Sequence, residues 1–506
     1  MTDKRFRGAP KKIVIVGGGT AGWMAAAFVA KTTQGRLGEI HVVESEQIGT
    51  IGVGEATIPY ILDFNRILGI DEAEFIRQTK ATFKLGIEFR DWTRLGHTYL
   101  HPFGTIGAPF GRTAFQHFLT KRALAGTVED LEAYSLCSAA ARRNSFAPTA
   151  GRRDGVFSTF GYAYHFDAGL YAAFLRSYAE KAGVKRHEGR IVEVGQNPDS
   201  GFVTAVTLEN GEAIDGDLFL DCSGLAGLLI GKTLGTGFED WSQWLPCNRA
   251  AFVPSQRVEP LTPYTRATAK SAGWQWRIPL QHRIGNGYVF SSDFTDDETA
   301  AASLLDGLDS ERLAEPRFLR FTTGRREAFW VKNVVALGLS GGFLEPLEST
   351  SIHLIHSGLI KLADLWPTGD FNPLVSEQYN RAVGAEYETI RDFLILHYKA
   401  TQRDDSAFWN YCRGMDVPDS LTYRLEHFRS SGRIILTRGD LFQPPSWLAV
   451  MLGQGILPQG YDPMADIVPD AVVEAQFESM RTTIAQTARA LPTHEEVIAR
   501  IVAQRA

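Results

Sequence analysis

The sequence of 506 residues contains few cysteines and no pair of them at CxxC spacing. Widely scattered thiols argue against a zinc site and against a disulfide framework, and they fit a reducing cytoplasm, which is the expected location. We therefore expect no bound metal. The cysteines are Cys137, Cys222, Cys247 and Cys412.

The chain also has no excess of positive charge and no long apolar run. Its net charge is -6, so it offers no polybasic field to attract nucleic acid. No stretch approaches the ~20 consecutive apolar residues of a membrane span. It has no internal repeat and no low-complexity linker, so we expect intertwined modules, and neither nucleic acid nor a membrane as a partner.

Residues 13 to 30, "IVIVGGGTAGWMAAAFVA", predict a buried strand, a tight turn and a helix. Three glycines occupy the GxGxxG positions, which let the backbone approach a pyrophosphate at the helix N-terminus. Glu44 follows about twenty residues later at the end of the next predicted strand, where an acid accepts a ribose hydroxyl. We expect a dinucleotide site at Gly17, Gly19, Thr20, Ala21, Gly22 and Glu44.

Two later segments favour FAD over NAD as the dinucleotide. "GDLFLDCSG" (Gly216 to Gly224) is a buried strand that ends in small residues, and "NVVALGLSGGFLEPLEST" (Asn333 to Thr350) is a strand, a glycine-rich turn and a helix start. Repeated returns to one sheet over such a length suit a large FAD module with insertions rather than a compact NAD domain. Gly338 and Leu339 in the last turn are expected to contact FAD.

"GWQWRIP" (Gly273 to Pro279) predicts a strand with two indoles on one face, because successive strand side chains point to opposite sides. Other short motifs accompany it: "GGGTAGW" at 17–23, "GVGEATIP" at 52–59, "FK" at 83–84, "HFDA" at 165–168, "DCSG" at 221–224 and "EPLEST" at 345–350. With these motifs the chain resembles the flavin-dependent halogenases of the tryptophan halogenase type, from about residue 11 to 400. It is most similar to the bromide-preferring indole halogenases from metagenomic sources.

The resemblance implies an α/β (α+β) fold. A Rossmann-like FAD-binding module of the aromatic hydroxylase (flavin monooxygenase) type is expected with an intertwined sheet and a helical C-terminal module. The expected borders are a flexible N-terminus at 1–10, a discontinuous FAD module at 11–365 with inserted segments at about 96–160 and 231–330, and a helical module at 366–506.

The resemblance also implies the chemistry. FADH2 from a separate NADH-dependent flavin reductase is expected to react with O2, so that halide is oxidised to hypohalous acid. This oxidant then halogenates a small electron-rich aromatic molecule, such as indole or an indole derivative, by electrophilic substitution. A homodimer is one option for the assembly. Further FAD contacts are expected at Glu55, Ala56 and Thr57, and tunnel or substrate contacts at His101, Phe103, Trp274, Trp276, Ile278 and Pro279.

The resemblance places the catalytic residues at Lys84 and Glu348. An ammonium can hydrogen-bond hypohalous acid and polarise it, whereas a neutral amine can be converted to a haloamine, and the sequence leaves both routes open. A carboxylate near the lysine can orient the oxidant or remove the ring proton. Glu345, one helical turn before Glu348, is the competing candidate, and an exposed acid pair at a helix start is the alternative to both.

The halide is expected at the backbone amides of Thr350 and Ser351, since helix N-termini bind anions. Ser351 stands where the family usually has glycine, and we expect bromide to be preferred over chloride. The tryptophan-specific members hold their substrate with a C-terminal lid. Here the corresponding stretch, 439–458, carries Pro444 and Pro445, which are expected to break the helix of that lid. A simpler indole is therefore expected to be a better substrate than free tryptophan.

Two alternatives stay open. One is a flavin monooxygenase that hydroxylates an aromatic compound, and the other is a flavin-binding, halogenase-like protein without activity. Against the first, "ALGLSGG" has Gly338, Leu339 and Ser340 where monooxygenases usually have a glycine-aspartate pair. Against the second, both Lys84 and Glu348 are present.

Overall fold

The computed structural model describes residues 8–48, 54–147 and 154–504. The chain forms two compact units, each assembled from three stretches, so the predicted intertwined α/β fold is confirmed. The borders predicted at 11–365 and 366–506 stay a prediction, and most of the predicted flexible N-terminus (residues 1–7) lies outside the described residues. Unit 1 comprises Met1–Lys80, Phe166–Ser242 and Phe321–Glu388, and unit 2 comprises Ala81–His165, Gln243–Arg320 and Thr389–Ala506.

A six-stranded sheet forms the centre of unit 1, in the order β20-β21-β12-β1-β2-β8. Neighbouring strands are parallel except for the edge pair β20 and β21. Parallel strands that are covered on both faces have continuous apolar runs in their sequences, and "IVIV" of β1 is such a run. The strands are β1 (Lys12–Val16), β2 (Glu39–Glu44), β8 (Lys185–Glu188), β12 (Leu218–Asp221), β20 (Trp330–Val331) and β21 (Val334–Ala336).

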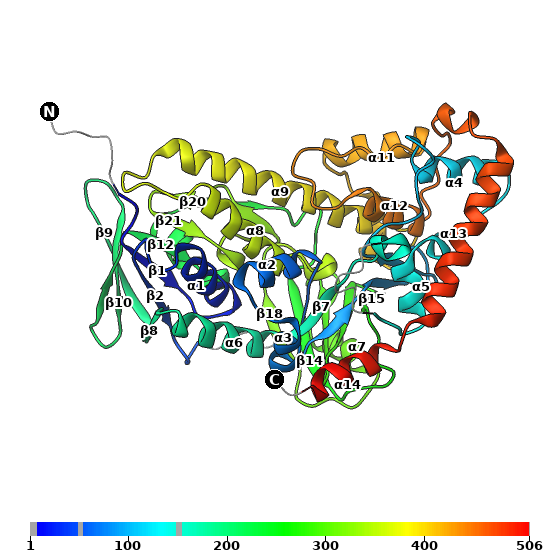
Figure 1. Cartoon of the computed structure of the whole chain (residues 1–506). Coiled ribbons are helices and arrows are strands. Elements are labelled where there is room, and N and C mark those ends of the chain that lie inside the picture. The colour runs from blue at the N-terminus through cyan, green and yellow to red at the C-terminus, as the bar shows by residue number, and fades with distance from the viewer. Residues whose placement is uncertain (1–7, 49–53, 148–153, 505–506) are drawn as a thin grey trace. The chain divides into compact units, whose positions relative to one another are not determined.

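Helices and short ribbons surround this sheet. Helix α1 packs against α6 and α8, and β9 and β10 form an antiparallel ribbon with β11 (Figure 1). The Asp167 carboxylate caps α6 by accepting from the amide of Gly169 at 3.0 Å. The elements are α1 (Thr20–Thr33), α2 (Tyr60–Leu68), α3 (Glu72–Thr79), α6 (Ala168–Lys181), α8 (Ser351–Asp364), β3 (Gly54–Ala56), β9 (Ile191–Gln196), β10 (Val203–Leu208), β11 (Ala213–Asp215), β13 (Phe238–Asp240), β19 (Gly324–Arg326) and β22 (Gly342–Phe343).

A seven-stranded sheet forms the centre of unit 2, in the order β18-β14-β17-β16-β15-β5-β6. Only β5 and β15 are parallel to each other; every other neighbouring pair is antiparallel. Beside it, β4 (Thr82–Lys84) pairs with β7 (Ala163–Asp167). The sheet strands are β5 (Gly86–Arg90), β6 (Thr98–Pro102), β14 (Arg249–Ser255), β15 (Thr265–Lys270), β16 (Gly273–Pro279), β17 (Ile284–Phe290) and β18 (Arg317–Arg320).

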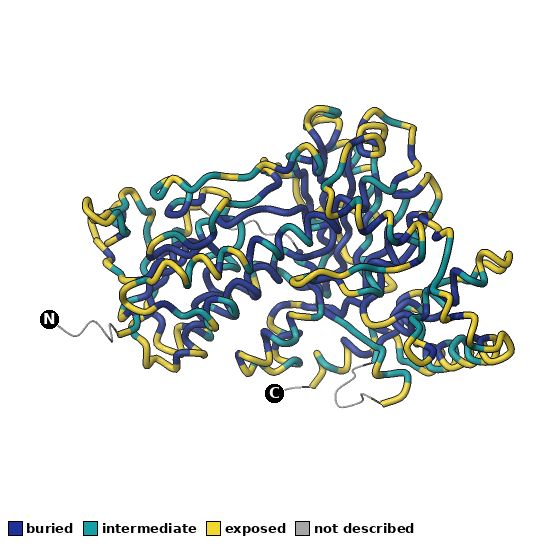
Figure 2. Tube along the Cα trace, turned by 90° about the horizontal axis from the view of Figure 1, so that it is seen from above, coloured by how far each residue is buried: buried dark blue, intermediate teal, exposed yellow. Residues whose placement is uncertain are grey.

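Most helices of unit 2 come from the C-terminal third of the chain. Helix α9 (Pro373–Lys399) begins in unit 1 and ends in unit 2. Buried stretches, dark blue in Figure 2, alternate along the chain with exposed yellow loops. The other helices are α4 (Phe115–Leu124), α5 (Leu136–Arg142), α7 (Asp297–Asp306), α10 (Ala407–Gly414), α11 (Asp419–Ser431), α12 (Pro444–Gly453), α13 (Asp470–Ala490) and α14 (His494–Ala503).

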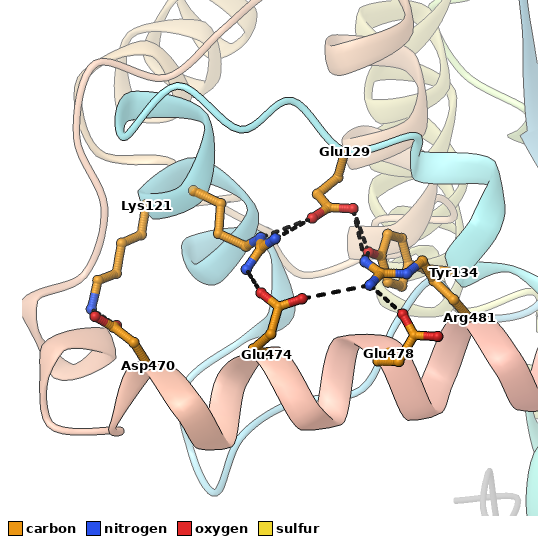
Figure 3. Close-up of polar contacts among 8 residues, drawn as sticks. Lys121, Glu129, Tyr134, Asp470, Glu474, Glu478 and Arg481 are labelled. Atoms are coloured by element: carbon orange, nitrogen blue, oxygen red, sulfur yellow. Dashed lines mark hydrogen bonds and ion pairs between the residues drawn. The ribbon is translucent and has the colours of Figure 1, made fainter.

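An ion-pair network holds helix α13 against α4 and against the loop that follows α4 (Figure 3). The Arg481 guanidinium donates to the Tyr134 hydroxyl at 2.7 Å and to the Glu129 carboxylate at 3.1 Å. Arg122 bridges the same Glu129 and, at 2.5 Å, Glu474 of α13. Each such pair is partly exposed and weak alone, but their connection fixes one position for α13 in unit 2.

No helix in the described part of the chain combines the length and apolar character needed to cross a membrane. All four cysteine thiols are buried.

Candidate active site

The carboxyl ends of four parallel strands meet at one edge of the unit 1 sheet. Val16 of β1 is level with Val43 of β2 and with Asp221 of β12, and Asp221 is level with Ala336 of β21. The glycine turn after β1 therefore lies beside the turns after β12 and β21. The sequence prediction that 216–224 and 333–350 return to the sheet of the glycine motif is confirmed.

The glycine turn has the close contacts that the motif predicts. Gly17 has a φ of +113° and donates its N–H to Val43 O at 2.8 Å. A Cβ on Gly17 would lie 2.3 Å from Cys222 O, and one on Gly22 would lie 1.8 Å from Gly17 O. Gly19 is the N-cap of α1, and within the described residues no side chain caps it. The first amides of α1 therefore fit a pyrophosphate.

The Glu44 carboxylate lies over this turn, where a Cβ on Gly18 would approach its Oε2 to 1.6 Å. It already accepts hydrogen bonds from Trp23 Nε1 at 3.2 Å and from Arg186 Nε at 2.5 Å. Each carboxylate oxygen has two lone pairs, so these contacts orient the group without filling its capacity. Its predicted contact with a ribose stays a prediction.

The segment at 333–350 packs directly on the glycine motif at 17–22. Gly338 has a φ of +68°, and a Cβ there would lie 3.0 Å from the Cβ of Ala21. Asp221 anchors the neighbouring turn: its carboxylate accepts from the amides of Leu229 and Ile230, each at 2.8 Å. The motif "DCSG" alone does not reveal these hydrogen bonds, because their donors belong to a later turn.

Glu55, Ala56 and Thr57 follow directly on residues 49–53, which lie outside the described part of the chain. Burial raises the pKa of the Glu55 carboxyl to about 7. A neutral carboxyl can donate as well as accept a hydrogen bond. Thr57 lines a small pocket of unit 1 together with Ile58, Ile61, Ile352, His353 and His356.

Both candidate glutamates of unit 1 are buried, so the exposed acid pair considered from the sequence is wrong. Glu345 precedes the short 3-10 helix Pro346–Glu348, and Glu348 ends it. The two glutamates therefore lie at the two ends of one tight helical turn. Ser349 then adopts a φ of +60°, which reverses the chain into α8.

The N-terminus of α8 fits an anion. Thr350 is its N-cap and Ser351 its first residue. The buried Thr350 hydroxyl has no hydrogen-bond partner among the residues described. First-turn amides of a helix also lack intrahelical acceptors. These donors suit a halide, and the halide site at Thr350 and Ser351 stays a prediction.

In unit 2, Lys84 ends β4 with its side chain fully buried. Its Nζ lies 5.1 Å from the centroid of the Phe103 ring, within cation–π range. The amide of Phe103 donates to Leu85 O at 2.8 Å, which ties the two segments together. The structure thus brings together two residues that the sequence named separately.

His165 is a buried neighbour of Lys84 that was not singled out from the sequence. Thr82 donates its hydroxyl to Pro279 O at 2.7 Å, so at 3.1 Å it must accept from His165 Nδ1. His165 Nε2 then accepts from the Thr265 hydroxyl at 2.9 Å. Burial, and after it the charge of Lys84, lowers the pKa of His165 well below its ordinary value. The imidazole is therefore neutral.

The two indoles lie on one face of β16, as predicted. Trp274 is opposite Ala269 and Trp276 opposite Ala267, and the ring centroids are 6.1 Å apart. On the other side, Gly287 of β17 is paired with Trp276. The two alanines of β15 and Gly287 leave space for the large rings, whereas Val289 of β17 is paired with Trp274. Ile278 and Pro279 complete the buried strand.

Replacing Gly287 with valine is expected to destabilise the protein by about 1–3 kcal/mol, because side chains forced into a packed core strain it. A Cβ at Gly287 would lie 2.1 Å from the Trp276 ring. The measurement is the free energy of unfolding in denaturant. Gly414→Ala is the control, since a Cβ at Gly414 has nothing within 4 Å. Equal stability of both variants would contradict this account.

An aromatic cluster lies beside His101. The rings of Phe393 and Phe442 stack at 3.9 Å, and His101 lies 5.7 Å from Phe393. Trp447 adds an edge contact to Phe393 at 4.9 Å. Arg424 lies 4.8 Å over the Trp447 ring and is held by Asp440 at 3.0 Å. The predicted pocket residue His101 therefore lies among aromatic side chains of unit 2.

The prediction that Pro444 and Pro445 break the lid helix is wrong. They occupy the first turn of α12, which runs from Pro444 to Gly453. An amide in the first helical turn has no intrahelical acceptor, so a proline costs nothing there and its fixed φ favours the helix.

The tryptophan halogenase family model matches residues 12–470. The chain belongs to the tryptophan halogenase family. Among solved structures, this family member is similar to Xcc4156, a flavin-dependent halogenase from Xanthomonas campestris, with 47% identity, a TM-score of 0.94 and coverage of 98% of this chain and 99% of that one. BrvH, a flavin-dependent halogenase from Brevundimonas sp. BAL3, has 44% identity, a TM-score of 0.94 and coverage of 99% and 100%.

A curated relative, the tryptophan 6-halogenase SttH from Streptomyces toxytricini, is 36% identical over 515 residues, which cover 97% of this chain and 98% of the relative. The protein is thus a flavin-dependent halogenase. Enzymes of this family use FAD, a halide, an aromatic substrate and a separate flavin reductase.

The predicted site residues of this halogenase are divided between the two units. The flavin motif residues, Glu348, Thr350 and Ser351 belong to unit 1, whereas Lys84, His101, Phe103, Trp274 and Trp276 belong to unit 2. The pairing of Lys84 with Glu348 stays a prediction. No cluster of three or more metal-ligating side chains occurs in the ranges that the structure describes.

Proposed function

We propose that the enzyme uses FADH2, O2 and halide to make hypohalous acid, which halogenates indole or an indole derivative by electrophilic substitution, with bromide favoured over chloride. The observation that carries this proposal is the fully buried Lys84, whose Nζ lies 5.1 Å from the Phe103 ring centroid. An aromatic side chain at that distance marks the surroundings of the lysine as apolar, as an aromatic substrate requires.

Unit 1 is proposed to hold the cofactor and the halide. The open first turn of α1 would bind the pyrophosphate, and Glu44 the ribose. When bound and reduced, FAD would supply two electrons and the halide two more, which reduces O2 to water and hypohalous acid. The amides of Thr350 and Ser351 would hold the halide, and the buried Thr350 hydroxyl adds a donor.

Unit 2 is proposed to use the oxidant. Lys84 either donates a hydrogen bond to hypohalous acid or carries the halogen as a haloamine. His165 is neutral, so in either route it adds no positive charge beside the Lys84 amine. Trp274 and Trp276 would line the route to Lys84 and exclude an aromatic ring from it. Glu348 would orient the oxidant or accept the proton that leaves the ring.

The stretch at 439–458, which corresponds to the lid of the tryptophan-specific members, favours a substrate without an ammonium and a carboxylate. The cluster beside His101 is aromatic, and Arg424, which lies over Trp447, is already committed to the Asp440 carboxylate. Burial of an unpaired ammonium and carboxylate costs several kcal/mol, so free tryptophan lacks a place for its charges. Indole requires no such partners.

A competition assay tests the substrate and the halide together. With FAD, a flavin reductase, NADH, O2, equal bromide and chloride, and equal indole and tryptophan, we expect brominated indole as the main product by mass spectrometry. The preference for indole should be at least about tenfold, because a site without polar partners rejects a charged analogue. Ser351, which adds a side chain at the α8 N-terminus, and the easier oxidation of bromide account for the halide preference.

Equal or faster chlorination would contradict the halide preference, and tenfold better turnover of tryptophan would contradict the substrate. A hydroxylated product would instead indicate a monooxygenase. NADH as the reductase's electron donor, a homodimeric assembly and a cytoplasmic location remain predictions.

A further inference from the structure

The amide of Phe83, next to Lys84, points away from the strand that β4 pairs with. In an antiparallel pair, successive residues turn their amides alternately toward and away from the partner. Phe83 N–H donates to Nε2 of His494 at 3.0 Å, across 411 residues of sequence. Both residues are fully buried. The outer edge of the strand that carries Lys84 is therefore completed by a side chain from the C-terminal helix α14.

This contact fixes the protonation of His494. A backbone N–H can only donate, so Nε2 carries a lone pair. The other ring nitrogen, Nδ1, lies 2.9 Å from Leu261 O, which can only accept, so Nδ1 carries the proton. Burial lowers the pKa of His494 to about 4, in agreement with a neutral ring. One imidazole thus bridges a backbone donor and a backbone acceptor.

The start of α14 is itself held firmly. The amide of His494 donates to Asn144 O at 2.8 Å, and the amide of Phe146 donates to Pro492 O at 3.0 Å. The Phe146 ring stacks on the Phe83 ring at 3.8 Å. Thr493 and Glu496 form a capping box at the first turn. These contacts give His494 one position relative to β4.

The residues on either side of Lys84 are thereby tied to one loop. Leu85 N–H donates to Pro263 O at 2.7 Å, while Phe83 N–H reaches Leu261 O through the His494 ring. The loop at 261–263 and the imidazole together hold the backbone on both sides of the lysine. His494 lies beyond residue 470, where the match to the family model ends.

We propose that His494 is a positioning residue for Lys84: its Nε2 lone pair holds the Phe83 amide and so sets the height and direction of the lysine side chain. This inference rests on the proposed role of Lys84. The ring touches neither substrate nor cofactor in this role. Without the Nε2 acceptor, the Phe83 amide would lose this hydrogen bond, while the pairing of β4 with β7 would remain.

Two amide variants separate the two hydrogen bonds of the ring. Glutamine places an acceptor at about the reach of Nε2, whereas asparagine reaches only as far as Nδ1. His494→Gln should keep halogenation within about threefold of wild type, and His494→Asn should lower kcat about 10- to 100-fold, the cost of a small misplacement of a reacting group. KM for indole and the rate of flavin oxidation should not change in either variant.

Hydrogen exchange gives a readout independent of activity: the peptide containing Phe83 should exchange faster in His494→Asn than in His494→Gln. Val497→Ala is the matched control, since Val497 is a buried residue of the same helix with no bond to β4. Its Tm should fall while the kcat for halogenation is kept. Equal losses of kcat in the Asn, Gln and control variants would overturn the proposal and leave His494 a purely structural residue. Lys84→Ala separates the two claims, because full halogenation by that variant would refute the proposed role of Lys84, on which this inference rests.

Discussion

Lys84→Ala is expected to lower halogenation by at least about 10²–10³-fold, the usual cost of removing one preorganised donor to a reacting group. Flavin oxidation and peroxide release should continue at the wild-type rate. The residues of the glycine motif all belong to unit 1, whereas Lys84 belongs to β4 of unit 2, so the change leaves the flavin motif intact. The measurements are halogenated product by mass spectrometry and NADH consumption with peroxide detection.

The variant also removes a long side chain from a fully buried position, so stability must be followed in parallel. Lys84→Met keeps most of the stem without the ammonium and should be as inactive as Lys84→Ala. Lys270→Ala is the control: it removes a different lysine of unit 2, which is only half-buried and whose pKa burial lowers. Halogenation by Lys84→Met above about a tenth of the wild-type rate would exclude both proposed routes through the amine.

The parts of the fold that the sequence predicted depend on local pattern. The apolar run of β1, the glycines after it and the alanine-rich α1 lie within residues 12–33. Their side chains and φ requirements identify a strand, turn and helix without knowledge of the remainder. The two indoles on one face of β16 follow in the same way from period-two alternation.

The contacts that the sequence did not reveal join segments far apart in the chain. Nothing near Thr493 and His494 indicates that the imidazole accepts from Phe83, and nothing near His165 indicates Thr82 and Thr265 as its partners. Such pairings follow from how the strands and helices pack. A motif can identify Lys84, but the residues that hold its strand depend on the tertiary fold.

Local rules also failed where position within an element decides the outcome. Two adjacent prolines remove two amide donors, which predicts a broken helix in the middle of a segment. In α12 the same residues stand in the first turn, so they begin the helix. The start of that helix could have been placed from the prolines themselves, because proline is favoured in the first helical turn.

Glu348→Gln is expected to lower kcat by about 10²–10⁴-fold, the usual contribution of a general base, while KM for the aromatic substrate changes little. Glutamine keeps the volume of the buried side chain but cannot accept the ring proton. Glu348 ends the 3-10 helix, two residues before the proposed halide amide of Thr350. A carboxylate at this position can act on the oxidant or on the ring, whereas Glu345 stands before the turn.

Glu345→Gln is the matched control, because both glutamates are buried and both changes replace a carboxyl group with an amide of similar volume. It should retain product formation within about tenfold of wild type, since a group that takes no part in proton transfer leaves kcat nearly unchanged. Single-turnover assays with preformed hypobromous acid bypass the flavin and measure the halogenation step directly. If Glu345→Gln lost that step and Glu348→Gln kept it, the base would be Glu345, and the 3-10 turn would present the opposite end of Pro346–Glu348 to the substrate.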